Sequence, residues 1–109
     1  DTANCYAHGT SEEFLGRAIK ASGVARDKVV IATKVYFNEG CLSKAAIERE
    51  IDGSLKRLGM DYVDLYIIYR FDYNTPIAET MEALSSLVDN GKVRALGASA
   101  MYGYQLMKM

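Results

Sequence analysis

Three side chains of this sequence are of the types that can together give a proton to a carbonyl oxygen. Asp1 and Tyr6 lie in the opening segment DTANCY, and Lys34 directly follows the apolar run VVIAT. A phenol with a pKa of ~10 is a poor acid at neutral pH, but a nearby ammonium group stabilises the phenolate and lowers that pKa. A carboxylate beside the ammonium group would keep it charged and oriented. The three groups together would make Tyr6 a general acid.

Polar side chains also follow the two later apolar runs. Tyr69, Arg70 and Asp72 come after YVDLYII, and Ser99 comes after VRALGA. Each has an ordinary structural explanation: a lysine or tyrosine at a strand end is commonly solvated or packed, Ser99 could cap the next helix, and Asp72 could organise a turn. Their shared position at the ends of successive runs favours a common site instead.

The elements that would position these residues alternate along the chain. Apolar, β-branched runs occupy residues 29–33, 62–68 and 93–98. Segments with helical spacing of apolar residues occupy residues 11–23, 43–59 and 75–91, and a further helix is expected to begin near Tyr102. This alternation predicts parallel strands joined by right-handed helical crossovers, which is an α/β fold.

The three longer helices each have an expected start and end, and a glycine marks the end of each. Ser11 is expected to cap the first helix and Thr75 the third, which has Pro76 at its first helical position, and the second helix is expected to start near Ser43. The expected terminating glycines are Gly23, Gly59 and Gly91. In the first helix we expect Phe14, Leu15, Ala18 and Ile19 to form the buried face.

The length of the repeating unit is compatible with a (β/α)8 barrel. The runs start 33 and 31 residues apart, against about 31 residues for each unit of a barrel of ~250 residues. Doubly wound sheets can have similar spacing, but no run is followed by a G-x-G-x-x-G segment or a P-loop. We therefore expect part of a (β/α)8 TIM barrel, with about three to four βα units, in which residues 1–109 form a single partial segment.

Composition limits the classes of function. The 109 residues carry a net charge of −1, which gives no electrostatic reason to expect binding to nucleic acid or to an anionic membrane. No apolar run approaches the ~20 residues of a membrane span, and no secretory leader is recognisable. Cys5 and Cys41 lie far apart and are expected to be free thiols, and His8 is the only histidine. We expect a cytoplasmic protein without a His-rich metal site.

Several stretches of the sequence resemble the aldo-keto reductase family. They are DTANCY, SEEFLGRAIK, RDKVVIATK, SLKRLGMDYVDLYII, NTPIAETMEALSSLVDNGKVRALGAS and MYGYQL. The pattern D-x-NTP-x-x-ET at residues 72–80 is similar to branches of the family that include bacterial reductases and potassium-channel β subunits. The resemblance implies reduction of aldehydes or ketones to alcohols with NADPH, on a small carbonyl substrate and without a metal.

The resemblance also implies a role for five residues. Tyr6 matches the general acid, Lys34 the residue that lowers its pKa, and Asp1 the carboxylate partner of the lysine and part of the cofactor site. Ser99 matches a residue that hydrogen-bonds the nicotinamide carboxamide. Tyr69 stands where the family usually has a histidine that orients the substrate carbonyl, so we count it among the catalytic positions.

Two positions and the length depart from the family pattern. Tyr69 is larger than histidine and titrates far from neutral pH, and Ala100 cannot make the amide hydrogen bonds of the asparagine that many members have after the serine. A whole (β/α)8 barrel requires far more than 109 residues. We therefore expect weak cofactor binding and impaired activity. The alternatives are a non-catalytic or regulatory nicotinamide-binding member of the family, or an inert fragment.

An incomplete barrel would also leave parts of its sheet without partners. Open strand edges and an apolar sheet face are surfaces that tend to associate. The sequence therefore predicts that the chain either self-associates through open sheet edges, by strand pairing or swapping, or is a fragment of a gene product.

Overall fold

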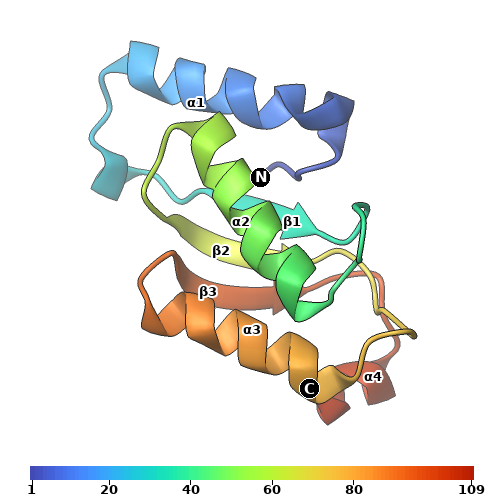
Figure 1. The fold of residues 1–109 in the computed structure, drawn as a ribbon. Helices are drawn as coiled ribbons and strands as arrows, with labels where there is room; N and C mark the ends of the chain where they lie inside the picture. The colour runs from blue at the N-terminus through green and yellow to red at the C-terminus, as the bar shows by residue number, and fades with distance from the viewer.

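The protein, described here over residues 1–109 by a computed structural model, contains one sheet of three parallel strands. The strands are β1 (Ala32–Val35), β2 (Val63–Ile68) and β3 (Val93–Ala98), in that order across the sheet. In register, Lys34 lies beside Ile67, and Ile67 lies beside Gly97. The predicted α/β class and the parallel arrangement of the strands are confirmed (Figure 1).

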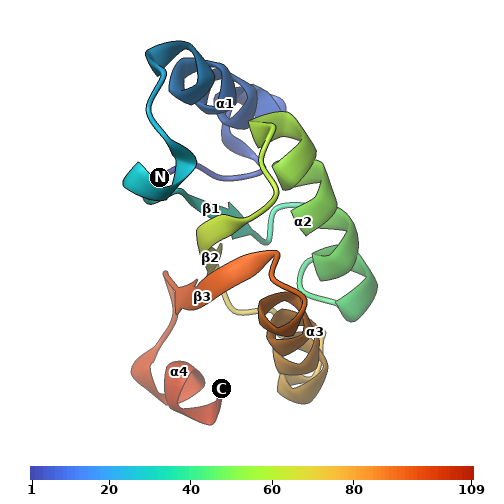
Figure 2. The same ribbon diagram turned by 90° about the vertical axis from the view of Figure 1, so that its left-hand side faces the viewer.

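The chain contains four helices, and those that connect the strands cover one face of the sheet. The four helices are α1 (Thr10–Ser22), α2 (Lys44–Leu58), α3 (Ile77–Asp89) and the short α4 (Gly103–Lys108), with 3₁₀ turns η1 (Tyr6–Gly9) and η2 (Arg26–Lys28). Figure 2 shows α2 and α3 on the same side of the sheet, with α1 beside α2 and α4 beyond the end of β3. Apolar side chains between this helical layer and the sheet form a core that includes Val35, Ile47, Ile51, Tyr66 and Leu84. None of the helices combines the length and the apolar composition that crossing a bilayer requires.

The other face of the sheet carries apolar side chains that the helical layer does not cover. Leu65 and Ile67 lie on this face together with Gly97, since a methyl group added at Gly97 would lie 3.3 Å from each of them. One edge of the sheet is occupied, because the N–H groups of Thr2 and Asn4 donate to carbonyls of β1. β3 pairs only with β2, so its other edge is open.

Gly16 allows the close contact between α1 and α2. A Cβ atom at this position would lie 2.2 Å from the carbonyl oxygen of Leu58, at the end of α2. Because that oxygen belongs to the backbone, any larger residue would push the two helices apart. The close packing of α1 on α2 therefore depends on glycine, which has no side chain, at position 16.

The prediction that the first strand covers residues 29–33 is wrong in its limits. β1 begins at Ala32 and continues through Lys34 to Val35, so Lys34 lies within the strand and does not follow it. Before that point the Val30 side chain is 79% exposed, and the carbonyl of Ile31 already accepts from the N–H groups of Asp64 and Leu65. The pairing with β2, and not the apolar run itself, sets where β1 starts.

Some of the predicted helix ends are confirmed. Ser43 caps α2, since its hydroxyl accepts from the N–H of Ala46. Gly23 and Gly59 end α1 and α2 in the left-handed conformation, with φ of 72° and 67°. Gly91, at φ 82°, follows Asn90, which is the residue that ends α3.

Other predicted caps are wrong. The hydroxyl of Ser11 lies 2.7 Å from that of Thr2, and Gly9 takes the capping position of α1. The hydroxyl of Thr75 donates to Asp72, and Pro76 precedes α3, which begins at Ile77. In each case another polar side chain takes the hydroxyl: Thr2 from the opening segment for Ser11, and Asp72 from the same loop for Thr75.

The predicted buried face of α1 is also partly wrong. Phe14 is 61% exposed and Ala18 is exposed, whereas Leu15 and Ile19 pack against the core. The side chain that α1 buries completely is that of Glu12.

Candidate active site

Lys34 lies at the centre of a cluster at the carboxyl ends of the strands, on the right in Figure 1. Its side chain is 10% exposed. The Nζ atom donates to Asp1 Oδ1 at 2.6 Å, to the carbonyl oxygen of Thr2 at 3.0 Å and to the hydroxyl of Tyr6 at 3.4 Å. All three N–H bonds of the ammonium group therefore have an acceptor. The structure brings together Asp1, Tyr6 and Lys34.

The opening segment is held against the edge of β1. The N–H of Thr2 donates to Ala32 O at 2.9 Å, and the N–H of Asn4 donates to Lys34 O at 3.2 Å. The side-chain amide of Asn4 also donates to Asn38 and Glu50. These bonds explain how residues near a chain terminus, which are commonly mobile, are fixed relative to Lys34.

Tyr69, directly after β2, completes the group of catalytic candidates. Its hydroxyl lies 3.3 Å from the hydroxyl of Tyr6, and the two rings meet edge to face with centroids 6.1 Å apart. Lys34 Nζ lies 4.9 Å from the ring centroid of Tyr6 and 5.7 Å from that of Tyr69. Tyr69 therefore takes part in the same hydrogen-bonded cluster as the other three residues.

The two phenols have pKa values shifted in opposite directions. The hydrogen bond from Tyr69, followed by the hydrogen bond from Lys34, lowers the pKa of Tyr6. The same bond to Tyr6, followed by desolvation, raises the pKa of Tyr69. Tyr6 is therefore the phenol that ionises first, with Tyr69 as the donor to its oxygen. This asymmetry is what a single proton-donating tyrosine requires.

Ser99 contacts the cluster through the backbone of Tyr69. Its N–H donates to Ile68 O and its hydroxyl donates to Tyr69 O, both at 2.9 Å. Ser99 thus fixes the backbone from which the Tyr69 side chain extends. Its role toward a nicotinamide carboxamide stays a prediction.

Asp72, the remaining polar candidate after β2, is not part of this cluster. It is 6% exposed and accepts hydrogen bonds from the N–H of Leu42, the N–H of Asn74 and the hydroxyl of Thr75. Burial opposes its ionisation, but these three bonds outweigh that effect and lower its pKa. Asp72 organises the loop before α3 and joins it to the loop before α2, in line with the structural explanation drawn from the sequence.

A buried ionic network that the sequence did not reveal lies behind β1. Glu12 is fully buried, and its carboxylate accepts from Thr33 Oγ1 at 2.7 Å and from Arg57 Nε at 2.8 Å. Thr33 directly precedes Lys34 in β1. The network therefore joins α1, α2 and the strand that carries the lysine. The one available signal was an acidic residue at a core-facing position of α1.

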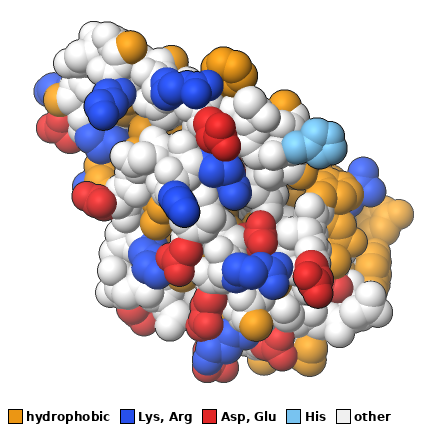
Figure 3. All heavy atoms as spheres, turned by 45° about the horizontal axis from the view of Figure 1, so that its top comes forward, with side chains coloured by type: hydrophobic (Ala, Val, Ile, Leu, Met, Phe, Trp, Pro, Cys, Tyr) orange, Lys and Arg blue, Asp and Glu red, His pale blue; other side chains and the backbone are white.

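Aromatic side chains pack beside Tyr69. Phe37, in the loop after β1, is 46% exposed, and its ring centroid lies 5.0 Å from those of Tyr69 and Tyr36. Figure 3 shows hydrophobic side chains gathered beside the pale blue His8. A ligand that reaches Tyr6 therefore meets an apolar, aromatic wall.

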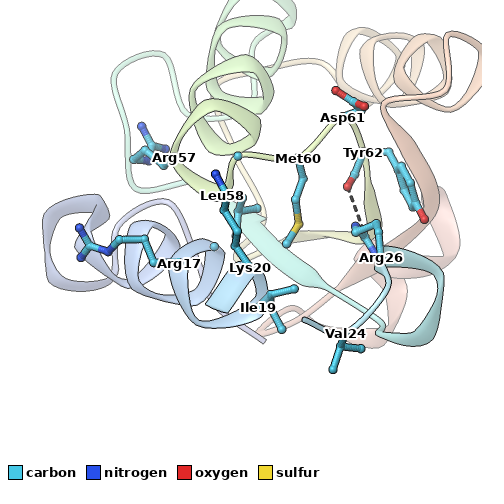
Figure 4. A pocket seen from close by; sticks show the side chains of 12 residues that line it. Arg17, Ile19, Lys20, Val24, Arg26, Arg57, Leu58, Met60, Asp61 and Tyr62 are labelled. Carbon is cyan, nitrogen blue, oxygen red and sulfur yellow. Dashed lines mark hydrogen bonds between the residues drawn. The ribbon is translucent and has the colours of Figure 1, made fainter. Parts of the chain in front are cut away.

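A separate hollow of about 440 Å³ lies between α1 and the loop that follows α2. Ile19, Val24 and Met60 line it, and Arg26 at its edge donates to the carbonyl oxygen of Tyr62 at 2.9 Å (Figure 4). None of the site residues predicted from the sequence lines this hollow. It is not part of the candidate active site.

Known proteins match this chain in both sequence and structure. The sequence model of the aldo/keto reductase family matches residues 1–109. The aldo-keto reductase YhdN of Bacillus subtilis is 45% identical over 91% of this chain and 31% of its own length. A probable voltage-gated potassium channel subunit beta of Oryza sativa is 38% identical over 97% of this chain and 34% of its own length. The chain thus spans about a third of these two relatives.

Solved structures agree with the sequence matches. The crystal structure of an aldo/keto reductase from Klebsiella pneumoniae, in complex with NADP and acetate, superposes with a TM-score of 0.87. It is 39% identical, and the match covers 98% of this chain and 36% of that protein. The three parallel strands of this chain therefore correspond to part of the barrel of that enzyme.

Proposed function

Because this chain belongs to the aldo/keto reductase family, we propose that its site reduces aldehydes or ketones to alcohols with NADPH. The observation that carries the proposal is the position of Lys34 Nζ, which donates to both Asp1 Oδ1 and the hydroxyl of Tyr6. A phenol beside a charged, carboxylate-paired ammonium group is suited to protonate a carbonyl oxygen.

Each residue of the cluster has a distinct part in this chemistry. NADPH, when bound, supplies the hydride that adds to the carbonyl carbon. Tyr6 gives its hydroxyl proton to the carbonyl oxygen, so that an alcohol forms and a phenolate remains. Lys34 stabilises that phenolate, and Asp1 keeps Lys34 oriented. Tyr69 donates to the oxygen of Tyr6 and adds to the stabilisation.

Ser99 and Asp1 are suited to the nicotinamide end of the cofactor. The hydroxyl of Ser99 donates to Tyr69 O, and its oxygen still has the capacity to accept from a carboxamide N–H. Asp1 is 66% exposed, so its second carboxylate oxygen is accessible. Ala100 offers no side-chain hydrogen bond. We therefore expect the 109-residue chain alone to bind NADPH weakly.

A hybrid enzyme tests this function. Residues 1–109 would replace the matching segment of B. subtilis YhdN, which is 45% identical, and NADPH oxidation would be followed with a small aromatic aldehyde. We expect turnover by the hybrid, and little change in NADPH fluorescence when the 109-residue chain is added alone. A folded hybrid that binds NADPH but reduces no carbonyl compound would contradict the proposal.

A regulatory or non-catalytic role is the second candidate. It is favoured by Tyr69, which occupies space next to the hydroxyl of Tyr6, and by Ala100. Binding of NADPH by the hybrid without turnover would support this role. Turnover would exclude it for these residues.

The hybrid also allows a test of the Lys34–Tyr6 contact by pH. Reduction needs protonated Tyr6, so kcat/KM should fall as pH rises through the pKa of Tyr6, which lies below its ordinary value. Lys34→Met removes a cation that stabilises the phenolate, so this pKa should rise. We expect a lower rate at neutral pH together with a decline of kcat/KM that begins at higher pH. The matched control is Lys56→Met, at an exposed position of α2, which should leave the pH profile unchanged. An unshifted profile for Lys34→Met would contradict the role of Lys34.

The open edge of β3 supports a further proposal, self-association of the 109-residue chain. Edge N–H and C=O groups, together with the apolar face that carries Leu65 and Ile67, are suited to pairing with a second copy. Light scattering should give a mass above 12.0 kDa that rises with concentration. Ala95→Lys, at an exposed position of β3, should lower that mass. A monomer at all concentrations, with cooperative unfolding, would contradict this prediction.

A further inference from the structure

We propose that a groove next to the candidate active site binds the carboxylate group of an aromatic carbonyl compound through Arg70. The groove has a volume of about 510 Å³. Its lining includes Tyr36, Arg70, Phe71, Tyr73, Met101 and Tyr102. These residues belong to the loops that follow β1, β2 and β3, which are the loops that also carry the catalytic candidates. We call this feature the Arg70 groove.

Arg70 has a free guanidinium group. It is exposed and makes no ion pair or hydrogen bond within the chain, and its Cζ atom lies 5.2 Å from the ring centroid of Phe37. By contrast, Arg26 and Arg57 are paired with Asp64 and Glu12. A guanidinium group that lies over a ring keeps the N–H donors in its own plane available. Such a planar group suits a carboxylate, which it can bind through two parallel hydrogen bonds.

Phe37 connects Arg70 to the proton-donating cluster. Its ring centroid lies 5.0 Å from that of Tyr69, and the Tyr69 hydroxyl lies 3.3 Å from that of Tyr6. One aromatic wall thus runs from the phenols, past Phe37, to the guanidinium group. Phe37 does not line the groove itself, but it contacts Arg70, which does. A flat ring compound whose carboxylate binds Arg70 could extend along Phe37 towards the phenols.

The floor of the groove is fixed by hydrogen bonds. Gln105 is 2% exposed, and its amide donates to the hydroxyl of Tyr73 and accepts from the N–H of Tyr102, at 2.8 and 2.9 Å. Ala100, which also lines the groove, has a φ of 48°, a conformation that disfavours any side chain. Backbone strain of this kind is concentrated at ligand sites, and a fixed wall lowers the entropy lost on binding.

The assignment of the ligand as a carbonyl substrate rests on the proposed function, whereas the binding of a carboxylate at Arg70 does not. The experiment therefore measures binding to the 109-residue chain by ¹H–¹⁵N NMR, without turnover. The probes are benzoate, 4-carboxybenzaldehyde, the neutral benzamide and NADP. NADP tests whether the anion could instead be a cofactor phosphate.

We expect benzoate and 4-carboxybenzaldehyde to shift the amide signals of residues 36–37, 70–73 and 100–102, with affinity that falls as salt is added. Benzamide and NADP should leave these signals in place. Arg70→Gln should weaken benzoate binding about five- to tenfold. The matched control is Arg94→Gln, because Arg94 is also exposed and stacked on a ring, that of Tyr62, but lies at the start of β3.

Equal binding of benzoate and benzamide would overturn the proposal, as would equal losses in the two arginine variants. Shifts of the same signals by NADP would assign the groove to the cofactor. If Arg70→Gln fails to fold, benzoate binding is measured for Arg70→Lys and for the unmodified chain at increasing salt. Unchanged benzoate affinity in both measurements would then overturn the proposal. Loss of turnover in the hybrid, with benzoate binding intact, would reject the proposed function and leave the carboxylate site in place.

Discussion

Tyr6→Phe is expected to lower carbonyl reduction in the hybrid enzyme by about 10²- to 10⁴-fold, the usual contribution of a general acid. The substitution removes one hydroxyl group and retains the ring, so the edge-to-face contact with Tyr69 persists. The affinity for NADPH should therefore stay close to that of the unmodified hybrid. The measurement is kcat/KM for a small aldehyde at neutral pH.

Two comparisons make this result specific to Tyr6. Tyr104→Phe removes a hydroxyl from an exposed tyrosine that stacks on Tyr102, away from Lys34, and should leave the rate unchanged. Tyr69→Phe should have a smaller effect than Tyr6→Phe, since it removes the bond that lowers the pKa of Tyr6 but leaves the donor in place. If Tyr69→Phe abolished reduction while Tyr6→Phe did not, Tyr69 would be the proton donor.

Arg57→Met should lower the free energy of unfolding by about 3–5 kcal/mol, which is the typical effect of removing one partner of a buried ion pair. Glu12 is fully buried, and Arg57 is the only cation paired with it. Without the guanidinium group, the carboxylate retains only the hydrogen bond from Thr33. Urea unfolding followed by circular dichroism measures the change.

The double variant Glu12→Gln with Arg57→Met separates charge from packing. The introduced amide side chain would have no charge to bury and could still accept from Thr33, so most of the lost stability should return. Lys92→Ala, which breaks the exposed pair with Asp52, serves as the control and should cost at most about 1 kcal/mol. A loss of similar size in Lys92→Ala and Arg57→Met would show that burial of Glu12 does not determine the effect.

The sequence by itself determined the features that depend on nearby residues. The alternation of β-branched runs with helical spacing predicted the α/β class, and Ser43, Gly23 and Gly59 marked helix ends that the structure confirms. A cap or a periodic face involves residues only a few positions apart. The sequence also predicted that Asp1, Tyr6 and Lys34 act together, because a carboxylate and an ammonium group can lower the pKa of a phenol and make it a proton donor.

Only the tertiary structure decided the features that need a partner from a distant segment. β1 starts at Ala32 because β2 pairs with it there, and Ser11 turns to Thr2 instead of capping α1. The burial of Glu12 depends on Arg57, 45 residues further along the chain. Hydrogen bonds and ion pairs gain their strength where burial excludes water, and the folded chain alone determines which groups meet there.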